Sequence, residues 1–329
     1  MVSKHHKKIL VPVLLFNFLV VSPNLFTQTN NDIVFSKKIN SPIFGESKVS
    51  YCKEKTNPAL LTWSEDFDKP KLSKSDWTYA KGNSFIYKGN LVPGWGNNEL
   101  QYYRIGRGKL NTNQNLFIED GLLKIQPIYH KNKYKKYQFT SARIHSKNKK
   151  SFTYPSKITF CFKVPSGIGF WPAFWLMPDK EINWPKGGEI DIMENRGRIS
   201  NISSSALHFG FTPNNKATLV GEVLIPQKVK FQDHFHSITL EWLENEINFY
   251  LNDETEPYFS VNSDMESFKE FGYPFNSSYY LIINVAAGGI YDDYWVDKSA
   301  FCNDKNCSNQ AYPNKKRFLI DWIEYQKLN

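Results

Sequence analysis

Lys157-Ile-Thr-Phe-Cys-Phe-Lys-Val164 is a segment in which large apolar side chains recur at every second position. In an extended chain, successive side chains point to opposite faces. The residues that would share one face are Ile158, Phe160, Phe162 and Val164. Those that would share the other are Thr159, Cys161 and Lys163. This period of two predicts a β-strand with one face turned toward a hydrophobic core.

Similar short segments occur on the C-terminal and N-terminal sides of this strand. They are Gly121–Gln126, His236–Trp242, Glu246–Leu251 and Tyr279–Val285. Clusters of Gly, Asn, Pro and Lys separate them, and long helical periodicity is absent. Many short strands joined by turns favour an antiparallel β-sandwich or barrel.

The composition fits a globular β protein. Of 329 residues, 41% are hydrophobic and 22% are charged, which excludes global disorder. Glycine contributes only 18 residues, which excludes a collagen-like chain. Aromatic residues reach 16%, and such residues both pack on pleated sheets and stack on sugar rings.

The chain is basic, with a formal net charge of +9 and a pI of about 9.1. Part of the charge lies in the lysine-rich run 131–150, which we interpret as a solvated basic loop. No RNA- or DNA-binding motif surrounds these lysines, so we expect no nucleic-acid partner. A weak attraction to anionic surfaces or polysaccharides stays open.

The first residues predict export from the cell. A basic start, Lys4 to Lys8, precedes an apolar run from Ile9 to Val21 that is too short to span a membrane. We interpret residues 1–28 as a signal peptide, residues 29–58 as a polar arm or linker, and residues 59–329 as one folded domain. We therefore expect a secreted protein without a membrane span.

Secretion would permit disulfides, and the chain has four cysteines: Cys52, Cys161, Cys302 and Cys307. The last two are close enough in sequence for a small loop, which would leave the first two as a pair. Three pairings are possible, however, and the sequence does not choose among them. Zinc binding is disfavoured because no paired metal-ligand spacing occurs. Glycosylation triplets begin at Asn201, Asn276 and Asn306.

Three acidic residues, Glu189, Asp191 and Glu194, follow two glycines. Glu189 and Asp191 alternate with isoleucines, so both would point to one face of a strand. Glu194 has the opposite parity. A β-bulge near Ile192 or Met193 would insert one extra residue and return Glu194 to the shared face.

Carboxyls held together raise one another's pKa. Cleavage of a glycosidic bond uses such a pair, one ionised to attack the anomeric carbon and one protonated to donate to the leaving oxygen. Trp171, Trp175 and Trp184 lie close in sequence and support this interpretation. An exposed acidic strand is the plain alternative. A metal site is a weaker alternative, because we could not place the further oxygen or histidine ligands it needs.

From Thr62 to Gln326 the sequence resembles glycoside hydrolase family 16, and within it the endo-β-1,3-glucanases (laminarinases). The shared blocks follow the family's order and are Trp63–Asp68, Gly94–Tyr103, Gly121–Ile125, Thr140–Ile144, Gly169–Pro178, Trp184–Glu194, Asn284–Gly289 and Phe318–Gln326. The resemblance implies a β-jelly roll of two curved antiparallel sheets with a sugar-binding cleft on the concave face. Residues 59–329 would then be the catalytic domain.

The resemblance also implies roles for the acids. Glu189 would be the nucleophile, Glu194 the general acid/base, and Asp191 would tune their protonation. The implied reaction is double displacement with retention of configuration on β-1,3-glucan. The spacing of two residues between Asp191 and Glu194 resembles that of the laminarinases. Lichenases and xyloglucan transglycosylases of the family typically have one residue at this place. No cofactor is implied for catalysis.

Further site residues follow from the same resemblance. The implied substrate-binding residues are Trp95, Asn98, Glu99, Arg143, Trp171, Trp175, Trp184, His208 and Asn284. Arg143, the segment Trp95–Glu99 and Trp184 would lie on the glycone side, whereas Trp171 and Trp175 would frame the cleavage point. A structural calcium is implied at Glu65, at Asp321 and at the carbonyl of Gly121.

The sequence departs from the family pattern in two places. Tyr154-Pro-Ser precedes the strand at Lys157, and Tyr291-Asp-Asp-Tyr-Trp follows Gly289. Both would reshape an edge of the cleft.

Three functions stay open. The first is a secreted, monomeric endo-β-1,3-glucanase acting on polysaccharide. The second is a non-catalytic β-glucan-recognition protein, against which the three acids argue. The third is the same chemistry on mixed-linkage glucan or on a galactan.

Overall fold

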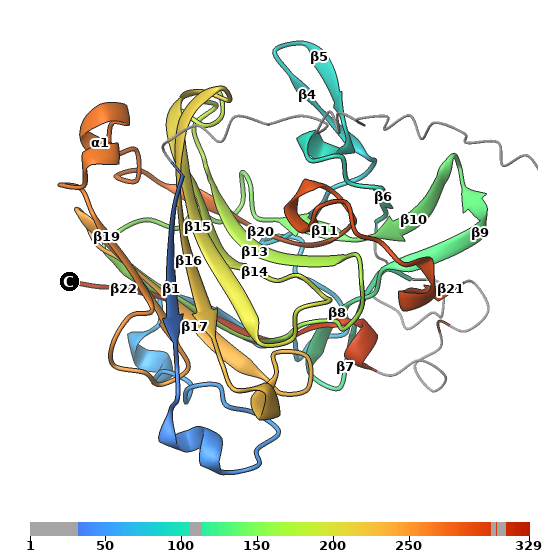
Figure 1. The fold of residues 1–329 in the computed structure, drawn as a ribbon, viewed down its shortest axis with the longest axis horizontal. Coiled ribbons are helices and arrows are strands. Elements are labelled where there is room, and N and C mark those ends of the chain that lie inside the picture. The colour runs from blue at the N-terminus through green and yellow to red at the C-terminus, as the bar shows by residue number, and fades with distance from the viewer. Residues whose placement is uncertain (1–31, 106–113, 304–306, 308–313) are drawn as a thin grey trace, which may run out of the picture.

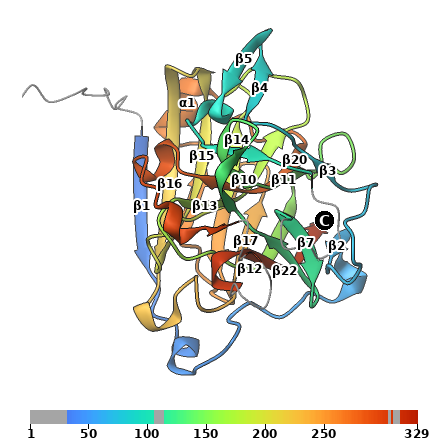
Figure 2. The same ribbon diagram turned by 90° about the vertical axis from the view of Figure 1, so that its right-hand side faces the viewer.

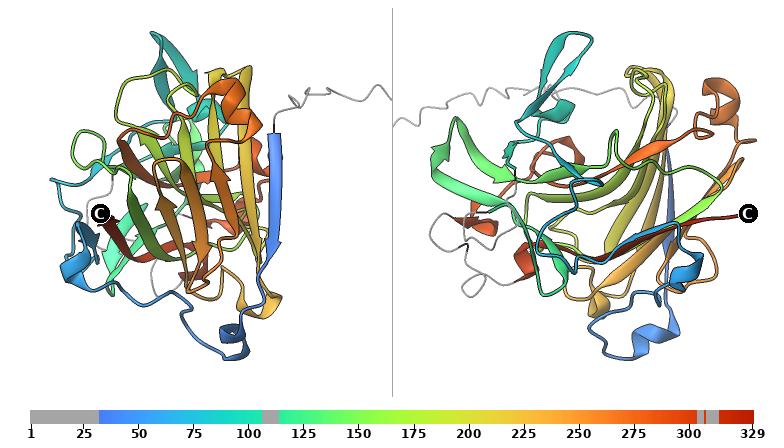
Figure 3. Two further views of the ribbon diagram at one scale, coloured as in Figure 1. Left: turned by 90° about the vertical axis from the view of Figure 1, so that its left-hand side faces the viewer. Right: turned by 180° about the vertical axis from the view of Figure 1, so that it is seen from behind.

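β-Strands make up nearly all of the regular structure in the computed structural model, which describes residues 32–105, 114–303, 307 and 314–329 (Figure 1). Two large curved sheets lie face to face, as Figure 3 shows from two sides. The predicted all-β sandwich is therefore confirmed. The predicted signal peptide, residues 1–28, lies outside the described residues.

The first sheet contains the acidic strand near its middle. Its strands, in order across the sheet, are β1 (Asp32–Lys38), β16 (Asn215–Leu224), β15 (Ile202–Thr212), β14 (Glu189–Glu194), β13 (Phe170–Pro178), β20 (Tyr279–Ala287), β11 (Arg143–His145) and β3 (Thr78–Tyr79). All neighbours are antiparallel except β1 and β16, which run parallel.

The second sheet is antiparallel and supports the first. Its order is β19 (Phe259–Asn262), β18 (Glu246–Leu251), β17 (His236–Trp242), β12 (Ser156–Lys163), β22 (Phe318–Lys327), β8 (Leu122–Ile125) and β7 (Leu116–Glu119), and β2 (Trp63–Glu65) also pairs with β22. The predicted strands at 236–242 and 246–251 agree with β17 and β18 residue for residue.

Smaller elements surround the two sheets. A third sheet has the order β21 (Cys302–Asn303), β9 (Ile128–Tyr134), β10 (Tyr137–Ser141) and β6 (Gln101–Tyr103), and β4 (Ser84–Tyr87) forms a hairpin with β5 (Asn90–Pro93). The described helices are α1 (Glu266–Phe271) and the 3-10 turns η1 (Pro42–Gly45), η2 (Pro58–Leu60), η3 (Gly94–Gly96), η4 (Gln227–Val229), η5 (Ile290–Asp292), η6 (Lys298–Ala300) and η7 (Asn314–Lys316). None of the described helices has the length and apolar character needed to cross a membrane.

Aromatic side chains fill the space between the two large sheets. On β12, Ile158, Phe160 and Phe162 are fully buried, as their alternation predicts. Phe160 stacks on Phe174 of β13, with ring centroids 3.7 Å apart. This contact joins the two layers directly beneath the strand pair β13–β14, so the acidic strand rests on a rigid support.

The segment before Pro58, interpreted from its polar composition as an arm or linker, packs along the body of the protein. Strand β1 joins the edge of the first sheet (Figure 2). Phe44 and Tyr51 are buried. Cys52 forms a disulfide with Cys161 of β12, and Cys302 pairs with Cys307. The outer face of β12 is therefore covered, which explains why Thr159 and Cys161 are buried although they alternate with the core residues.

The lysine-rich run 131–150 is not the loop that we expected. It forms the end of β9, then β10 and β11. Tyr129 and Phe139 of these strands contact each other, with centroids 5.6 Å apart, while the lysines of the β9–β10 turn are exposed. The lysine content hid a strand pattern carried by the aromatic residues, because the solvent-exposed turn of a hairpin tolerates charge.

Candidate active site

Strand β14 carries the three acids on one face. Asp191 pairs with Ala206 of β15, and Glu194 pairs with Ser204. Strand β14 thus advances by three residues while β15 advances by two. One residue of β14 is extra, which is the β-bulge predicted from the sequence, and it turns Glu194 to the face of Glu189 and Asp191.

A tryptophan donates a hydrogen bond to each glutamate. Trp184 Nε1 lies 2.8 Å from Glu189 Oε2, and Trp171 Nε1 lies 2.7 Å from Glu194 Oε1. Each bond engages one oxygen and orients the carboxyl.

Asp191 lies between the glutamates and faces a histidine. Its Oδ2 is 3.1 Å from His208 Nε2, and His208 Nδ1 is 3.1 Å from Thr218 Oγ1. Lys216 Nζ donates to the same Thr218 oxygen at 2.8 Å. The threonine hydroxyl therefore has its proton free to donate to Nδ1. Asp191 Oδ2 accepts no hydrogen bond from the described residues, so its contact with His208 Nε2 is one of proximity alone.

Burial raises the pKa of all three carboxyls. Together with the charge of Asp191, which is the second cause, it raises the pKa of Glu189 and of Glu194 to about 8. Burial also raises the pKa of Asp191 to about 8, with a hydrogen bond to Glu189 acting in the opposite direction. The pKa of His208 is lowered, again by burial. Near neutral pH the cluster therefore keeps protons, and the carboxyls are not all charged at once.

A cleft opens over these acids toward β20 and β11. Its lining residues are Asn97, Glu99, Arg143, Trp171, Ala173, Trp175, Glu189, Asp191, Glu194 and Asn284. The guanidinium carbon of Arg143 lies 4.4 Å from the ring centre of Trp95 and 4.7 Å from that of Trp175. Two tryptophan rings therefore hold the arginine in place at the cleft wall.

Glu99 and Asn284 complete this wall. Glu99 is buried and accepts hydrogen bonds from Gln101 Nε2 at 2.5 Å and from the Tyr103 hydroxyl at 3.1 Å. Burial raises the pKa of Glu99, while the charge of Arg143 lowers it. Asn284 Oδ1 accepts a 2.8 Å hydrogen bond from Trp175 Nε1, which fixes the orientation of the Asn284 amide in the cleft lining.

Four expected binding residues are not among those that line the cleft, and one of them, Trp95, has its ring against Arg143. Asn98 is exposed, and its Nδ2 lies 3.5 Å from the hydroxyl of Tyr294 rather than in the cleft lining. Trp184 and His208, whose ring centroids are 6.3 Å apart, lie toward β15. Arg143 lies on β11, on the β13 side of β14, whereas the ring of Trp184 lies near His208 of β15.

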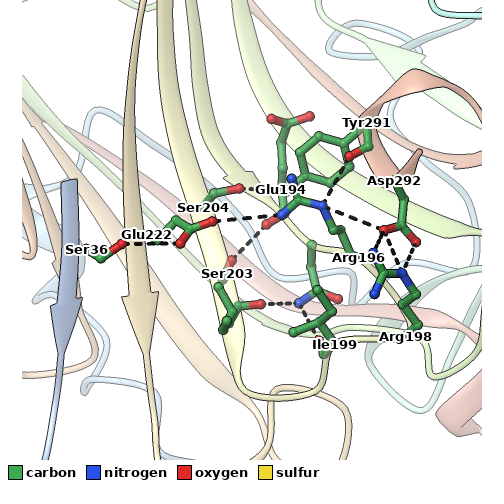
Figure 4. A network of polar contacts seen from close by, with 12 residues as sticks. Ser36, Glu194, Arg196, Arg198, Ile199, Ser203, Ser204, Glu222, Tyr291 and Asp292 are labelled. Carbon is green, nitrogen blue, oxygen red and sulfur yellow. Dashed lines mark hydrogen bonds and ion pairs between the residues drawn. The ribbon is translucent and has the colours of Figure 1, made fainter. Parts of the chain in front are cut away.

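Residues behind Glu194 were missed by the sequence analysis. Tyr291 stacks on Trp171, with ring centroids 4.8 Å apart, and Arg196 lies over the Tyr291 ring at 4.3 Å. Asp292 pairs with Arg196 and with Arg198 (Figure 4). The signal in the sequence was the unusual segment after Gly289, because a changed segment at the cleft edge brings new neighbours to the acids.

Two groups of residues offer metal ligands. Glu189, Asp191 and His208 place one ligand atom each within 4.8 Å of one another, but Glu189 already accepts a hydrogen bond from Trp184. The expected calcium ligands lie on the second sheet. Asp321 is the extra residue of a bulge in β22, and Glu65 lies on the adjacent strand β2.

In the second group, the two oxygens of Glu65 accept hydrogen bonds from Phe67 N and Trp77 Nε1. Gly121 lies in the turn from β7 to β8, and β8 pairs with β22 next to Asp321. Burial raises the pKa of Asp321, and the charges of Asp66 and Asp68 raise it further, while Lys55 lowers it. Asp321 is therefore a partly buried carboxyl beside other acids, and oxygen ligands of this kind are the type that calcium prefers.

Comparison with known proteins identifies the family. Residues 106–323 match the family model of glycosyl hydrolases family 16. The chain belongs to this family. Similar proteins include a glucan endo-1,3-beta-glucosidase of Cryptopygus antarcticus, which is 31% identical over 73% of this chain and 85% of its own length.

Two further similar proteins extend the comparison. Glucan endo-1,3-beta-glucosidase A1 of Niallia circulans is 31% identical over 72% of this chain, which spans only 36% of that longer protein. The laminarinase catalytic domain of Thermotoga maritima superposes with a TM-score of 0.67 at 30% identity, over 82% of this chain and 98% of the domain. The jelly-roll architecture expected from the sequence is therefore confirmed.

Proposed function

We propose that this protein is a secreted endo-β-1,3-glucanase that hydrolyses laminarin-like glucan with retention of configuration. The observation that carries the proposal is the bulged strand β14, which presents Glu189, Asp191 and Glu194 together at the floor of a cleft. The family and the activity named for its similar members support the substrate class. The two disulfides are consistent with secretion.

In the first step, Glu189 would attack the anomeric carbon through one carboxyl oxygen. The hydrogen bond from Trp184 holds the other oxygen and stabilises the ionised form. Glu194 would donate its proton to the departing glycosidic oxygen, so the bond from carbon to that oxygen breaks as the bond to Glu189 forms. The product is a glycosyl ester and a shortened chain with a new hydroxyl.

In the second step, Glu194 would act as a base. Having lost its proton, it would accept one from water, and the hydroxide oxygen would displace Glu189 from the anomeric carbon. The raised pKa of Glu194 suits both steps, because a group that titrates near the working pH can give and take a proton. Two inversions restore the original configuration.

The remaining residues would set the charge and hold the sugar. Asp191, with His208 at 3.1 Å, would adjust the proton distribution between the glutamates. Arg143, held between two tryptophan rings, and the amide of Asn284 would donate to sugar hydroxyls. Trp175 would offer an apolar surface to a ring face. We infer a monomer with a polysaccharide as its partner and no cofactor in the reaction.

The test uses purified protein with laminarin, mixed-linkage glucan and agarose, and follows the products over time. We expect rapid release of mid-length oligosaccharides from laminarin, with the β-anomer appearing first in proton NMR. Glu189→Gln and Glu194→Gln should each lower turnover by about 10²–10⁴-fold while leaving the thermal unfolding transition cooperative.

Three results would contradict the proposal. Near wild-type turnover by either variant would overturn the assigned roles. Laminarin binding without products from any polymer would favour a recognition protein. Cleavage of agarose alone would keep the chemistry and change the substrate.

A further inference from the structure

The face of the first sheet that carries the acids continues beyond β14, across β15 and β16 to β1. We refer to it as the catalytic face. Register-paired residues form three rows on it, and each row begins at one acid. The row from Glu189 continues through His208 and Thr218 to Asp32. The row from Asp191 continues through Ala206 and Val220 to Val34. The row from Glu194 continues through Ser204 and Glu222 to Ser36.

Strand β1 turns Val34 and Ser36 to this face. Phe35, which lies between them, contacts Phe259 of the second sheet with ring centroids 5.7 Å apart, so it points into the sandwich. Side chains alternate along a strand, and its two neighbours therefore point outward. Ser36 Oγ donates a 3.2 Å hydrogen bond to Glu222 Oε2 (Figure 4), and Val34 is 60% exposed.

The three rows differ in chemistry. The middle row, Ala206, Val220 and Val34, is apolar, and the rows on either side carry hydroxyl, carboxyl and imidazole groups. A pyranose ring has apolar C–H faces and hydroxyls around its rim, so an apolar strip with polar borders matches it. Strands in a sheet lie about 4.8 Å apart, which makes the strip from β14 to β1 about 14 Å long. That length exceeds a single sugar ring.

We propose that β1 completes a glucan-binding strip that lengthens the cleft on the side of β14 away from Arg143. The inference rests on the proposed glucanase function and deepens it, because it makes the length of bound chain depend on a strand from the N-terminal segment. The occupant is a β-glucan chain, since the strip runs without a break from the acids that would cleave one. Val34 would contact the apolar face of a sugar ring, and Asp32 and Ser36 would form hydrogen bonds with sugar hydroxyls.

The test compares two neighbouring positions of β1. Val34→Arg places a long charged side chain in the strip at an exposed site. Ile33→Arg is the matched control, because Ile33 is 41% exposed, is adjacent and points to the opposite face. Both changes are made in the Glu189→Gln variant, so that binding is measured without hydrolysis. Calorimetry then gives Kd for a β-1,3-linked glucose trisaccharide and for an octasaccharide.

We expect Val34→Arg to weaken octasaccharide binding about tenfold, which corresponds to losing the burial of roughly one apolar side chain. Trisaccharide binding should stay unchanged, and Ile33→Arg should alter neither affinity. A milder variant, Val34→Ser, should lose part of the octasaccharide affinity in the same direction, and it guards against misfolding of the arginine variant.

Several outcomes would overturn the inference. Equal octasaccharide affinities for Val34→Arg and Ile33→Arg would do so, as would an equal loss for both sugar lengths. Size-exclusion chromatography tests whether a second copy of the chain binds to the strip instead. The wild type would then be a dimer that Val34→Arg converts to a monomer, without a change in sugar binding. Inactivity of the wild type on laminarin would overturn the proposed function, while the binding comparison would still decide the role of β1.

Discussion

Glu194 is controlled by side chains that lie behind it. Trp171 donates a hydrogen bond to its carboxyl, and the positive charge of Arg196 lowers its pKa against the larger effect of burial. Arg196 is held in turn by the carbonyl of Tyr291 at 3.1 Å and by Asp292 at 3.7 Å. The segment after Gly289 therefore acts on Glu194 indirectly. It holds Arg196 in place, and its Tyr291 ring stacks on Trp171, which donates to Glu194.

Replacing Arg196 tests this control. Arg196→Gln removes a positive charge, so the pKa of Glu194 should rise further and its proton should be kept to higher pH. Because the first step needs that proton, the alkaline limb of the profile of kcat/KM against pH should move upward. The profile is measured on laminarin. Arg198→Gln is the control, since Arg198 pairs with the same Asp292 at 2.8 Å and should leave the limb in place. An unmoved or lowered limb in Arg196→Gln would refute the electrostatic role.

The sequence predicted the acids but not these neighbours, for a physical reason. Glu189, Asp191 and Glu194 are adjacent along the chain, so strand geometry alone brings them together. Arg196 and Tyr291 are 95 residues apart, and only the folded sandwich places them in contact. The expected positions of Trp171, Trp175, Arg143, Glu99 and Asn284 in the cleft agree with its lining, whereas Asn98 does not line it.

At the scale of elements, strand β14 holds an unfavourable charge arrangement in the middle of a sheet. It is enclosed by β13 and β15, so water cannot fully solvate its carboxyls. The pKa of Glu189 is raised from 4.5 to about 8, chiefly by burial. A carboxyl with a raised pKa in the folded state contributes fully to stability only below its unfolded pKa, and that contribution is lost as the pH rises through the folded pKa.

Glu189→Gln should therefore stabilise the protein in alkaline solution. At pH 8 we expect a gain on the order of 2 kcal/mol in the free energy of unfolding, because a tenfold change in proton affinity is worth about 1.4 kcal/mol and the neighbouring acids share the effect. At pH 4 the variant and the wild type should unfold alike. Denaturant unfolding at both pH values measures this. The exposed Glu256→Gln should show no pH-dependent gain, and an equal gain in both variants would contradict the explanation.

Two elements show what pattern reasoning could and could not find. The bulge in β14 was predicted because a period of two makes the parity of Glu194 visible. Strand β1 was missed, although Ile33, Val34 and Phe35 form an apolar triplet within the polar segment. An edge strand has one partner and little buried area, so its sequence needs only a weak pattern, and the polar residues around the triplet outweighed it.

At the scale of the whole molecule, the N-terminal segment fastens the two layers together. Strand β1 joins the first sheet (Figure 2). The Cys52–Cys161 disulfide ties the same segment to the second sheet. Beyond the disulfide, Thr56 N donates to Glu324 of β22 at 3.0 Å, and Lys55 Nζ contacts Asp66 Oδ1 at 2.5 Å. The two-layer fold was predictable from the alternation of apolar and polar residues. The course of the N-terminal segment was not, because neither disulfide pairing nor strand order is encoded in a local stretch of sequence.

The acids near Lys55 lead to the last prediction, which concerns calcium. Asp321 is partly buried near Asp66 and Asp68, and we propose that it holds a structural calcium together with Glu65 and the Gly121 carbonyl. Calcium at about 100 times its Kd would add about 2.7 kcal/mol of stability and raise Tm by several degrees. Scanning calorimetry with calcium, with a chelator and with magnesium measures this, and magnesium should act weakly because it resists dehydration.

Asp321→Asn distinguishes the cation from a general salt effect. It should remove the Tm response to calcium while leaving laminarin hydrolysis at room temperature unchanged, because Asp321 lies on the second sheet and not in the β14 cleft. A Tm that does not respond to calcium in the wild type would contradict the site. It would mean that the ammonium of Lys55, already in contact with Asp66, supplies enough positive charge for these acids, and Lys55→Met should then destabilise the fold with or without calcium.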